Sequence, residues 1–132
     1  MVVTAFYAAL LAPLFVVLSV RVILFRRGSG STLGDGGDPV LLRRIRVQAN
    51  FAEYVPLALI LMGLAEGMGT NRWLLHPLGL VLLAGRASHA FGVSRPDEKF
   101  VFRVAGMGMT LTMILAAAAI CLIEAVSGRR PF

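Results

Sequence analysis

The chain has 132 residues, of which 58% are hydrophobic and 15% charged, and its mean hydropathy is +0.80. A water-soluble domain of this size is rarely so apolar, so the composition indicates an integral membrane protein. The net charge of +6 would suit a nucleic-acid partner only if the basic residues gathered on a soluble face, which they do not. The single cysteine, Cys121, excludes a disulfide or a cysteine metal site within one chain.

Four apolar runs follow one another along the chain, at about residues 2–25, 40–66, 73–92 and 100–126. Each is close to or above the roughly 20 residues that a helix needs to cross a bilayer. The first run lacks the basic start and the small-residue cleavage site of a signal peptide. A polar, glycine-rich segment from Arg26 to Pro39 joins the first two runs, and the other links are short. We therefore predict one domain over residues 1–132, all-α, an integral membrane four-helix bundle.

The basic residues are distributed unevenly along this predicted topology. Ten of them lie near the first and third links, and three, Arg72, Arg129 and Arg130, lie towards the other side. Because cytoplasmic loops of membrane proteins carry an excess of lysine and arginine, the first and third links are expected to be cytoplasmic. Both termini are then expected on the opposite side of the membrane.

The beginning of the second run carries polar side chains that acyl chains would not solvate. They follow one another at helical spacing: Arg43, Arg46, Asn50, Glu53 and Tyr54. A turn of about 100° per residue places the last four within roughly 100° of arc, and the stripe extends about 10 Å along the axis from Arg46 to Glu53. Polar groups at this depth must face protein, water or a ligand. The stripe predicts a buried polar ligand, although its arginines could also be membrane-surface anchors.

The third run adds two polar residues at the same level. Arg86 and His89 are three residues apart, so they share one face of a helix near its predicted cytoplasmic end. His76 lies near the other end, and two histidines on opposite sides of a membrane cannot share a metal ion. No metal site is predicted. Gly106 and Gly108, in the fourth run, are expected to allow close helix packing.

These motifs together resemble those of the MAPEG family, the membrane-associated proteins in eicosanoid and glutathione metabolism, in its bacterial form. The pattern Arg-x-Gln-x-Asn-x-x-Glu-Tyr-x-Pro runs from Arg46 to Pro56, Arg-x-x-His covers residues 86–89, and Arg103 lies near the start of the fourth run. The resemblance extends over nearly the whole chain. It implies a homotrimer in a bacterial inner membrane, with glutathione bound between adjacent subunits near the cytoplasmic face.

The resemblance also assigns roles to individual residues. Arg103 is implied to be catalytic, through activation of the thiol. The residues implied to bind glutathione are Arg46, Gln48, Asn50, Glu53, Tyr54, Arg86 and His89, together with Arg26 or Arg27 from the first helix. The residue types fit, since arginines bind carboxylates and Glu53 can accept from the ammonium group. Val93 departs from the family pattern, because several eicosanoid-forming members have a tyrosine there.

The expected function is a membrane-bound glutathione-dependent transferase that joins the thiolate of glutathione to hydrophobic electrophiles, with peroxidase activity on lipid hydroperoxides as a further option. Glutathione is then a co-substrate, and the bilayer supplies the electrophile. Two alternatives stay open. One is a non-catalytic member of the same family. The other is a small multidrug exporter, which would need a carboxylate in the first helix, whereas residues 1–25 contain no acidic residue.

Overall fold

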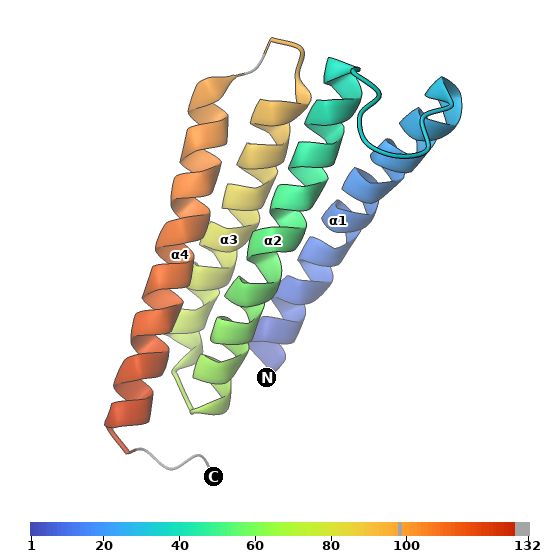
Figure 1. The fold of residues 1–132 in the computed structure, drawn as a ribbon. Coiled ribbons are helices and arrows are strands. Elements are labelled where there is room, and N and C mark those ends of the chain that lie inside the picture. The colour runs from blue at the N-terminus through green and yellow to red at the C-terminus, as the bar shows by residue number, and fades with distance from the viewer. Residues whose placement is uncertain (98, 129–132) are drawn as a thin grey trace.

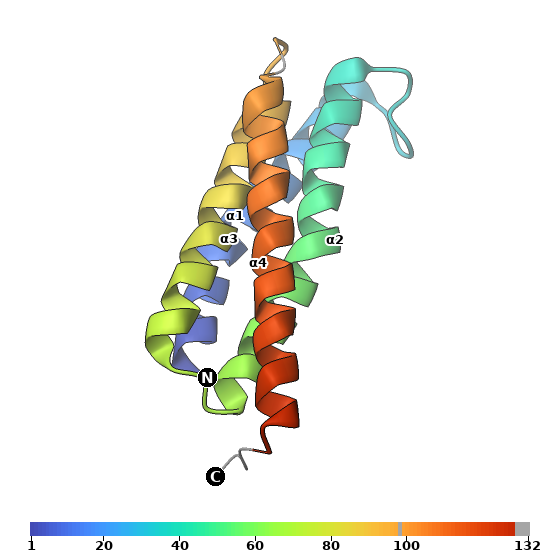
Figure 2. The ribbon, with the colours of Figure 1, turned by 90° about the vertical axis from the view of Figure 1, so that its left-hand side faces the viewer.

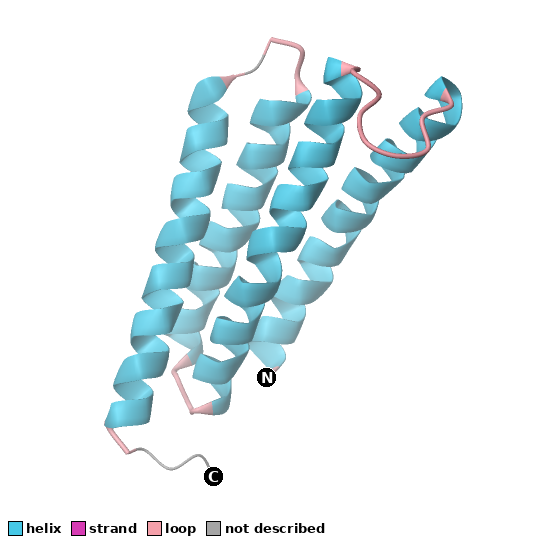
Figure 3. Cartoon of the chain, viewed as in Figure 1, coloured by secondary structure: helices cyan, strands magenta, loops and turns pink. Residues whose placement is uncertain are grey.

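The computed structural model describes residues 1–97 and 99–128, and within them the chain forms four long antiparallel helices (Figure 1). They are α1 (Val2–Ser29), α2 (Pro39–Gly67), α3 (Arg72–Ser94) and α4 (Phe100–Val126). The described residues contain no strand (Figure 3). The predicted all-α four-helix fold is confirmed. The expected boundary of the first helix was wrong, since α1 continues four residues beyond residue 25. Arg129 and Arg130, used in the charge count, lie outside the described residues.

Local sequence signals determine where the helices begin and end. The Asp38 carboxylate accepts hydrogen bonds from the backbone nitrogens of Val40 (2.8 Å) and Leu41 (3.2 Å), and Pro39 opens α2. At the start of α3, the Asn71 side chain accepts from the Trp73 nitrogen at 3.0 Å. Gly30 ends α1 with a φ of 68°, a left-handed conformation that glycine adopts without strain.

Among the described residues, α1, α2 and α4 are long and apolar enough to cross a membrane, whereas α3 is not. With 23 residues α3 meets the length requirement. It fails in composition because His76, Arg86 and His89 lie along it. This polar helix packs against each of the other three, and Figure 2 shows it beside α4 with α1 behind. The fold therefore keeps the helix that falls short of a membrane span in contact with protein.

Glycine allows α3 and α4 to approach closely. A Cβ at Gly106 would lie 2.5 Å from the Gly85 carbonyl oxygen and 2.6 Å from the backbone nitrogen of His89. A Cβ at Gly92 would lie 2.7 Å from the backbone nitrogen of Arg103. No side chain fits at such distances, so the two backbones touch at these points. These contacts bring His89 of α3 against α4 and Arg103 of α4 against α3. Gly106 thus packs as expected, but Gly108 does not, since a Cβ there would have no neighbour within 4 Å.

The two glycines of α4 form a matched pair for a stability test. Gly106→Ala is expected to lower the free energy of unfolding by about 1–3 kcal/mol, because the added methyl must push α3 and α4 apart. Gly108→Ala, two residues away in open space, should be neutral or slightly stabilising. Thermal unfolding in detergent, followed by a thiol-reactive dye on Cys121, compares them. Equal unfolding temperatures for the two variants would contradict the close backbone contact.

Candidate functional site

A polar cavity of about 180 Å³ lies between α2, α3 and α4, near the end of the bundle that carries the first and third links. Its lining residues are Leu42, Arg43, Arg46, Asn50, His89, Val93 and Arg103. Three of them are arginines, and none of the described lining residues is acidic. A cavity with this charge favours an anionic ligand. It brings Arg43, Arg46 and Asn50 of the polar stripe together with Arg103 of α4.

A buried arginine lies beneath this cavity. Arg86 is 1% exposed, and its Nη1 donates to Asn50 Oδ1 at 2.9 Å and to the Asn50 carbonyl oxygen at 3.4 Å. Its Nη2 lies 3.9 Å from the Met107 sulfur. Arg86 does not line the cavity. Within one subunit it holds the side chain of Asn50 in place.

The bond from Arg86 also sets the orientation of the Asn50 amide. The carboxamide oxygen accepts from the guanidinium, because a guanidinium has only donors and requires an acceptor. The amide NH₂ group is then the part of Asn50 that can address a ligand in the cavity. The polar lining of the cavity in this chain thus consists of donors from Asn50 and three arginines, with His89 buried beside them at 5% exposed.

Arg43 lines the cavity, although the sequence motifs did not assign it to glutathione binding. Its Nη1 donates to the carbonyl oxygens of Arg95 (2.6 Å) and Pro96 (2.8 Å). These bonds tie the first turns of α2 to the link between α3 and α4. The signal in the sequence was its position one turn before Arg46. Arg43 therefore closes the end of the cavity rather than leaving its guanidinium wholly to a ligand.

Several predicted ligands of glutathione lie outside this cavity. Glu53 is exposed and Gln48 and Tyr54 are half-buried, and none of them lines it. Glu53 stands near the middle of the 29-residue helix α2. In a single subunit, a carboxylate exposed at that depth would face acyl chains rather than water.

The two candidate arginines of α1 also lie away from the cavity. Arg26 donates from Nη1 to the Thr32 carbonyl oxygen at 2.9 Å, within the first link. Arg27 is exposed next to it. In Figure 1 this end of α1 diverges from the other helices. The structure of one subunit therefore does not bring either residue to Arg46 or Arg103.

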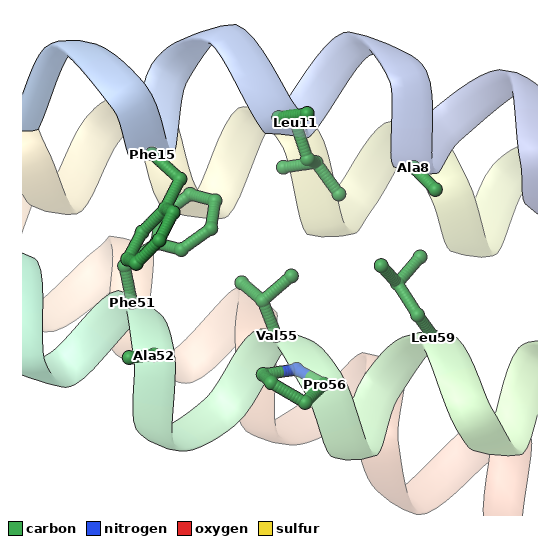
Figure 4. A pocket seen from close by; sticks show the side chains of 9 residues that line it. Ala8, Leu11, Phe15, Phe51, Ala52, Val55, Pro56 and Leu59 are labelled. Atoms are coloured by element: carbon green, nitrogen blue, oxygen red, sulfur yellow. The ribbon is translucent and has the colours of Figure 1, made fainter.

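An apolar pocket of about 350 Å³ lies on the other side of α2, between α1 and α2 (Figure 4). The rings of Phe15 and Phe51 stack at one end, with centroids 5.4 Å apart. Small side chains, including Ala8, Ala12 and Ala52, leave the space open. Sequence reasoning missed this pocket, because small residues on a membrane helix indicate close packing as readily as a void.

Four antiparallel helices, three of them apolar enough to span a bilayer, define a multi-pass membrane protein with a cationic cavity at one end. The chain belongs to the MAPEG family, whose model matches residues 4–123. It is 39% identical over 118 residues to the inner membrane protein YecN of Escherichia coli strain K12, a match that covers 86% of this chain and 88% of YecN. The YecN of strain CFT073 matches equally well. The predicted family and the predicted inner-membrane location are confirmed.

The contact between Arg86 and Asn50 leads to a prediction about stability without ligand. Asn50→Ala should lower the free energy of unfolding by about 1–3 kcal/mol, because it leaves the buried guanidinium short of an acceptor. Asn50→Asp retains an acceptor and should lose less. Gln48→Ala, an amide deletion half a turn away, serves as the control in the same thermal assay. An Asn50→Ala variant as stable as Gln48→Ala would show that Arg86 does not depend on this bond.

Proposed function

We propose that this protein is a membrane-bound glutathione-dependent transferase that joins glutathione thiolate to hydrophobic electrophiles. The observation that carries the proposal is the convergence of Arg43, Arg46 and Arg103 with the Asn50 amide in one cavity. Glutathione has two carboxylates and two amide carbonyls, all of which accept hydrogen bonds. A set of guanidinium and amide donors matches these acceptors. Membership of the MAPEG family agrees with this chemistry.

The size of the cavity supports a site shared between subunits. At about 180 Å³ it is smaller than the roughly 300–1,000 Å³ of most small-molecule pockets. The remaining candidate ligands, Gln48, Glu53 and Tyr54, lie outside it. We propose that a neighbouring copy completes the site in a homotrimer. Glu53 of one copy then binds the ammonium group of glutathione. This cation compensates the charge of the Glu53 carboxylate within the membrane.

The proposed chemistry needs an anionic sulfur. A free thiol has a pKa of about 8.5 and is mostly protonated at neutral pH, so a nearby guanidinium raises the reactive fraction. Arg103 is the exposed guanidinium that α4 contributes to the cavity. With an aryl halide, the thiolate forms a carbon–sulfur bond, and the halide leaves with the electron pair of its bond to carbon. With a lipid hydroperoxide, the thiolate attacks the terminal oxygen, the O–O bond breaks, and the alkoxide takes up a proton and leaves as the alcohol. A second glutathione then reduces the resulting sulfenic acid, which gives the disulfide and water.

The apolar pocket between α1 and α2 suits the hydrophobic electrophile. All of its lining residues are apolar, and the bilayer concentrates lipophilic compounds beside it. In one subunit it lies across α2 from the arginines, so a neighbouring subunit must bring the two reactants together. This geometry is a second reason to propose a trimer.

Binding and turnover test the proposal separately. Arg46→Ala should weaken glutathione binding by about 1–3 kcal/mol, because it removes a charged donor to a carboxylate. Arg103→Leu should keep most of the affinity and lose most of the turnover of a generic aryl halide, since its partner is the charged sulfur. Calorimetry and an absorbance assay measure the two quantities, with Arg95→Ala as a control outside the cavity. Parent protein that does not bind glutathione would refute the proposal, and binding without turnover would favour a non-catalytic family member.

The proposed assembly has its own test. Native mass measurement of the detergent-solubilised protein should give three copies. Glu53→Leu should remain trimeric but lose glutathione affinity, because the proposed role of this carboxylate is to bind the ligand ammonium. A monomeric parent protein would contradict a site shared between subunits, and an antiparallel dimer would favour the exporter alternative.

A further inference from the structure

A second polar cavity, of about 510 Å³, lies at the opposite end of the bundle, where α1 begins and α2 joins α3. It is larger than the cavity of the proposed glutathione site and shares no residue with it. Its polar lining comes from the N-terminal ammonium of Met1 and the side chains of Glu66, Thr70, Arg72 and His76. None of these residues is used in the proposed transferase chemistry.

Glu66 supplies a carboxylate to this cavity. Its two oxygens accept hydrogen bonds from the backbone nitrogens of Val3 and Thr4, each at 2.8 Å, and so cap the start of α1. The side chain is 12% exposed. Glu66 Oε1 also lies 4.0 Å from the N-terminal ammonium of Met1, so the carboxylate already faces one cation in this cavity. Its remaining lone pairs can accept from a second cationic donor.

Thr70 supplies a buried hydroxyl that needs a hydrogen-bond partner. The residue is 6% exposed, and its Oγ1 is buried without a hydrogen-bond partner among the described residues. Leaving a buried hydroxyl unpaired costs about 1–3 kcal/mol. Thr70 lines the cavity, and rotation about its Cα–Cβ bond can turn the hydroxyl towards a ligand there.

The remaining polar groups are basic. Arg72 is exposed at the first position of α3, next to Trp73, which is 77% exposed. An arginine beside an exposed tryptophan is typical of the membrane interface. The His76 ring is held by the Tyr7 hydroxyl, which lies 3.2 Å from Nδ1. The second ring nitrogen of His76 is the atom that can address a ligand.

We infer that this cavity binds the headgroup of a zwitterionic phospholipid that carries a primary ammonium group. Arg72 and Thr70 donate to the phosphate, and Glu66 accepts from the ammonium. Glu66 gives the cavity an acceptor for a cation, and Arg72 gives it a donor for a phosphate, so a zwitterion uses both groups whereas an anion uses only one. The exposed Val2 and Phe6 at the rim offer the acyl chains an apolar surface. This inference does not depend on glutathione binding.

Trp73 is the only tryptophan of the chain, so its fluorescence reports on this end of the bundle alone. Purified full-length protein in detergent is titrated with short-chain phosphatidylethanolamine, phosphatidylcholine and phosphatidylglycerol, and with water-soluble phosphoethanolamine. Saturable binding that is strongest for phosphatidylethanolamine is expected, because choline lacks N–H donors and glycerol lacks the cation. Equal responses to the three lipids would overturn the inference. A response to phosphoethanolamine as strong as the response to phosphatidylethanolamine would show that the acyl chains do not contribute, and would overturn the inference of a lipid ligand.

Two variants separate the headgroup contacts from stability. Thr70→Val removes the hydroxyl at nearly constant volume and should weaken binding roughly five-fold, and Arg72→Gln, at an exposed position, should weaken it at least as much. Arg95→Gln, at the other end of the bundle, is the matched control and should bind like the parent. Unchanged binding in Arg72→Gln would overturn the proposed phosphate contact, even if Thr70→Val failed to fold.

Discussion

The hydrogen bond from the buried guanidinium of Arg86 to Asn50 is the interaction on which the site depends. A charge in an apolar bundle must be enclosed and hydrogen-bonded, and Arg86 is 1% exposed on α3, a helix that contacts all three others. The bond joins α3 to the polar stripe of α2 and turns the Asn50 amide donor towards the cavity. Gly85 and Gly106 bring α4 close enough to add Arg103 to the same space.

A single subunit separates the features that the proposed reaction requires. The arginine-lined cavity lies on one side of α2 and the apolar pocket on the other, while Glu53 is exposed near mid-helix. In water such an exposed carboxylate would be unremarkable, but within a bilayer it calls for a polar partner. Assembly of several copies around α2 would satisfy this requirement and complete the site at once. The same constraint that disfavours an isolated subunit therefore favours a shared active site.

The sequence was most informative about features that depend on the contrast between water and the lipid bilayer. Apolar runs of membrane length predicted the four helices, and the helical spacing of Arg46 and Asn50 predicted that both face one cavity. It could not show that Arg86 lies beneath the cavity, because two residues on one helical face can still differ in depth. The apolar pocket and the contrast between Gly106 and Gly108 depend on how the helices cross, which no local pattern encodes.

The central proposal is that the arginine cavity holds glutathione with its sulfur as a thiolate. The most direct test is the ultraviolet absorption of the thiolate, recorded as glutathione is added to the purified protein at neutral pH. We expect a saturable absorption band, absent with S-methylglutathione, that reaches about one thiolate per proposed site. Glutathione that binds without this band would contradict thiolate stabilisation by the cavity.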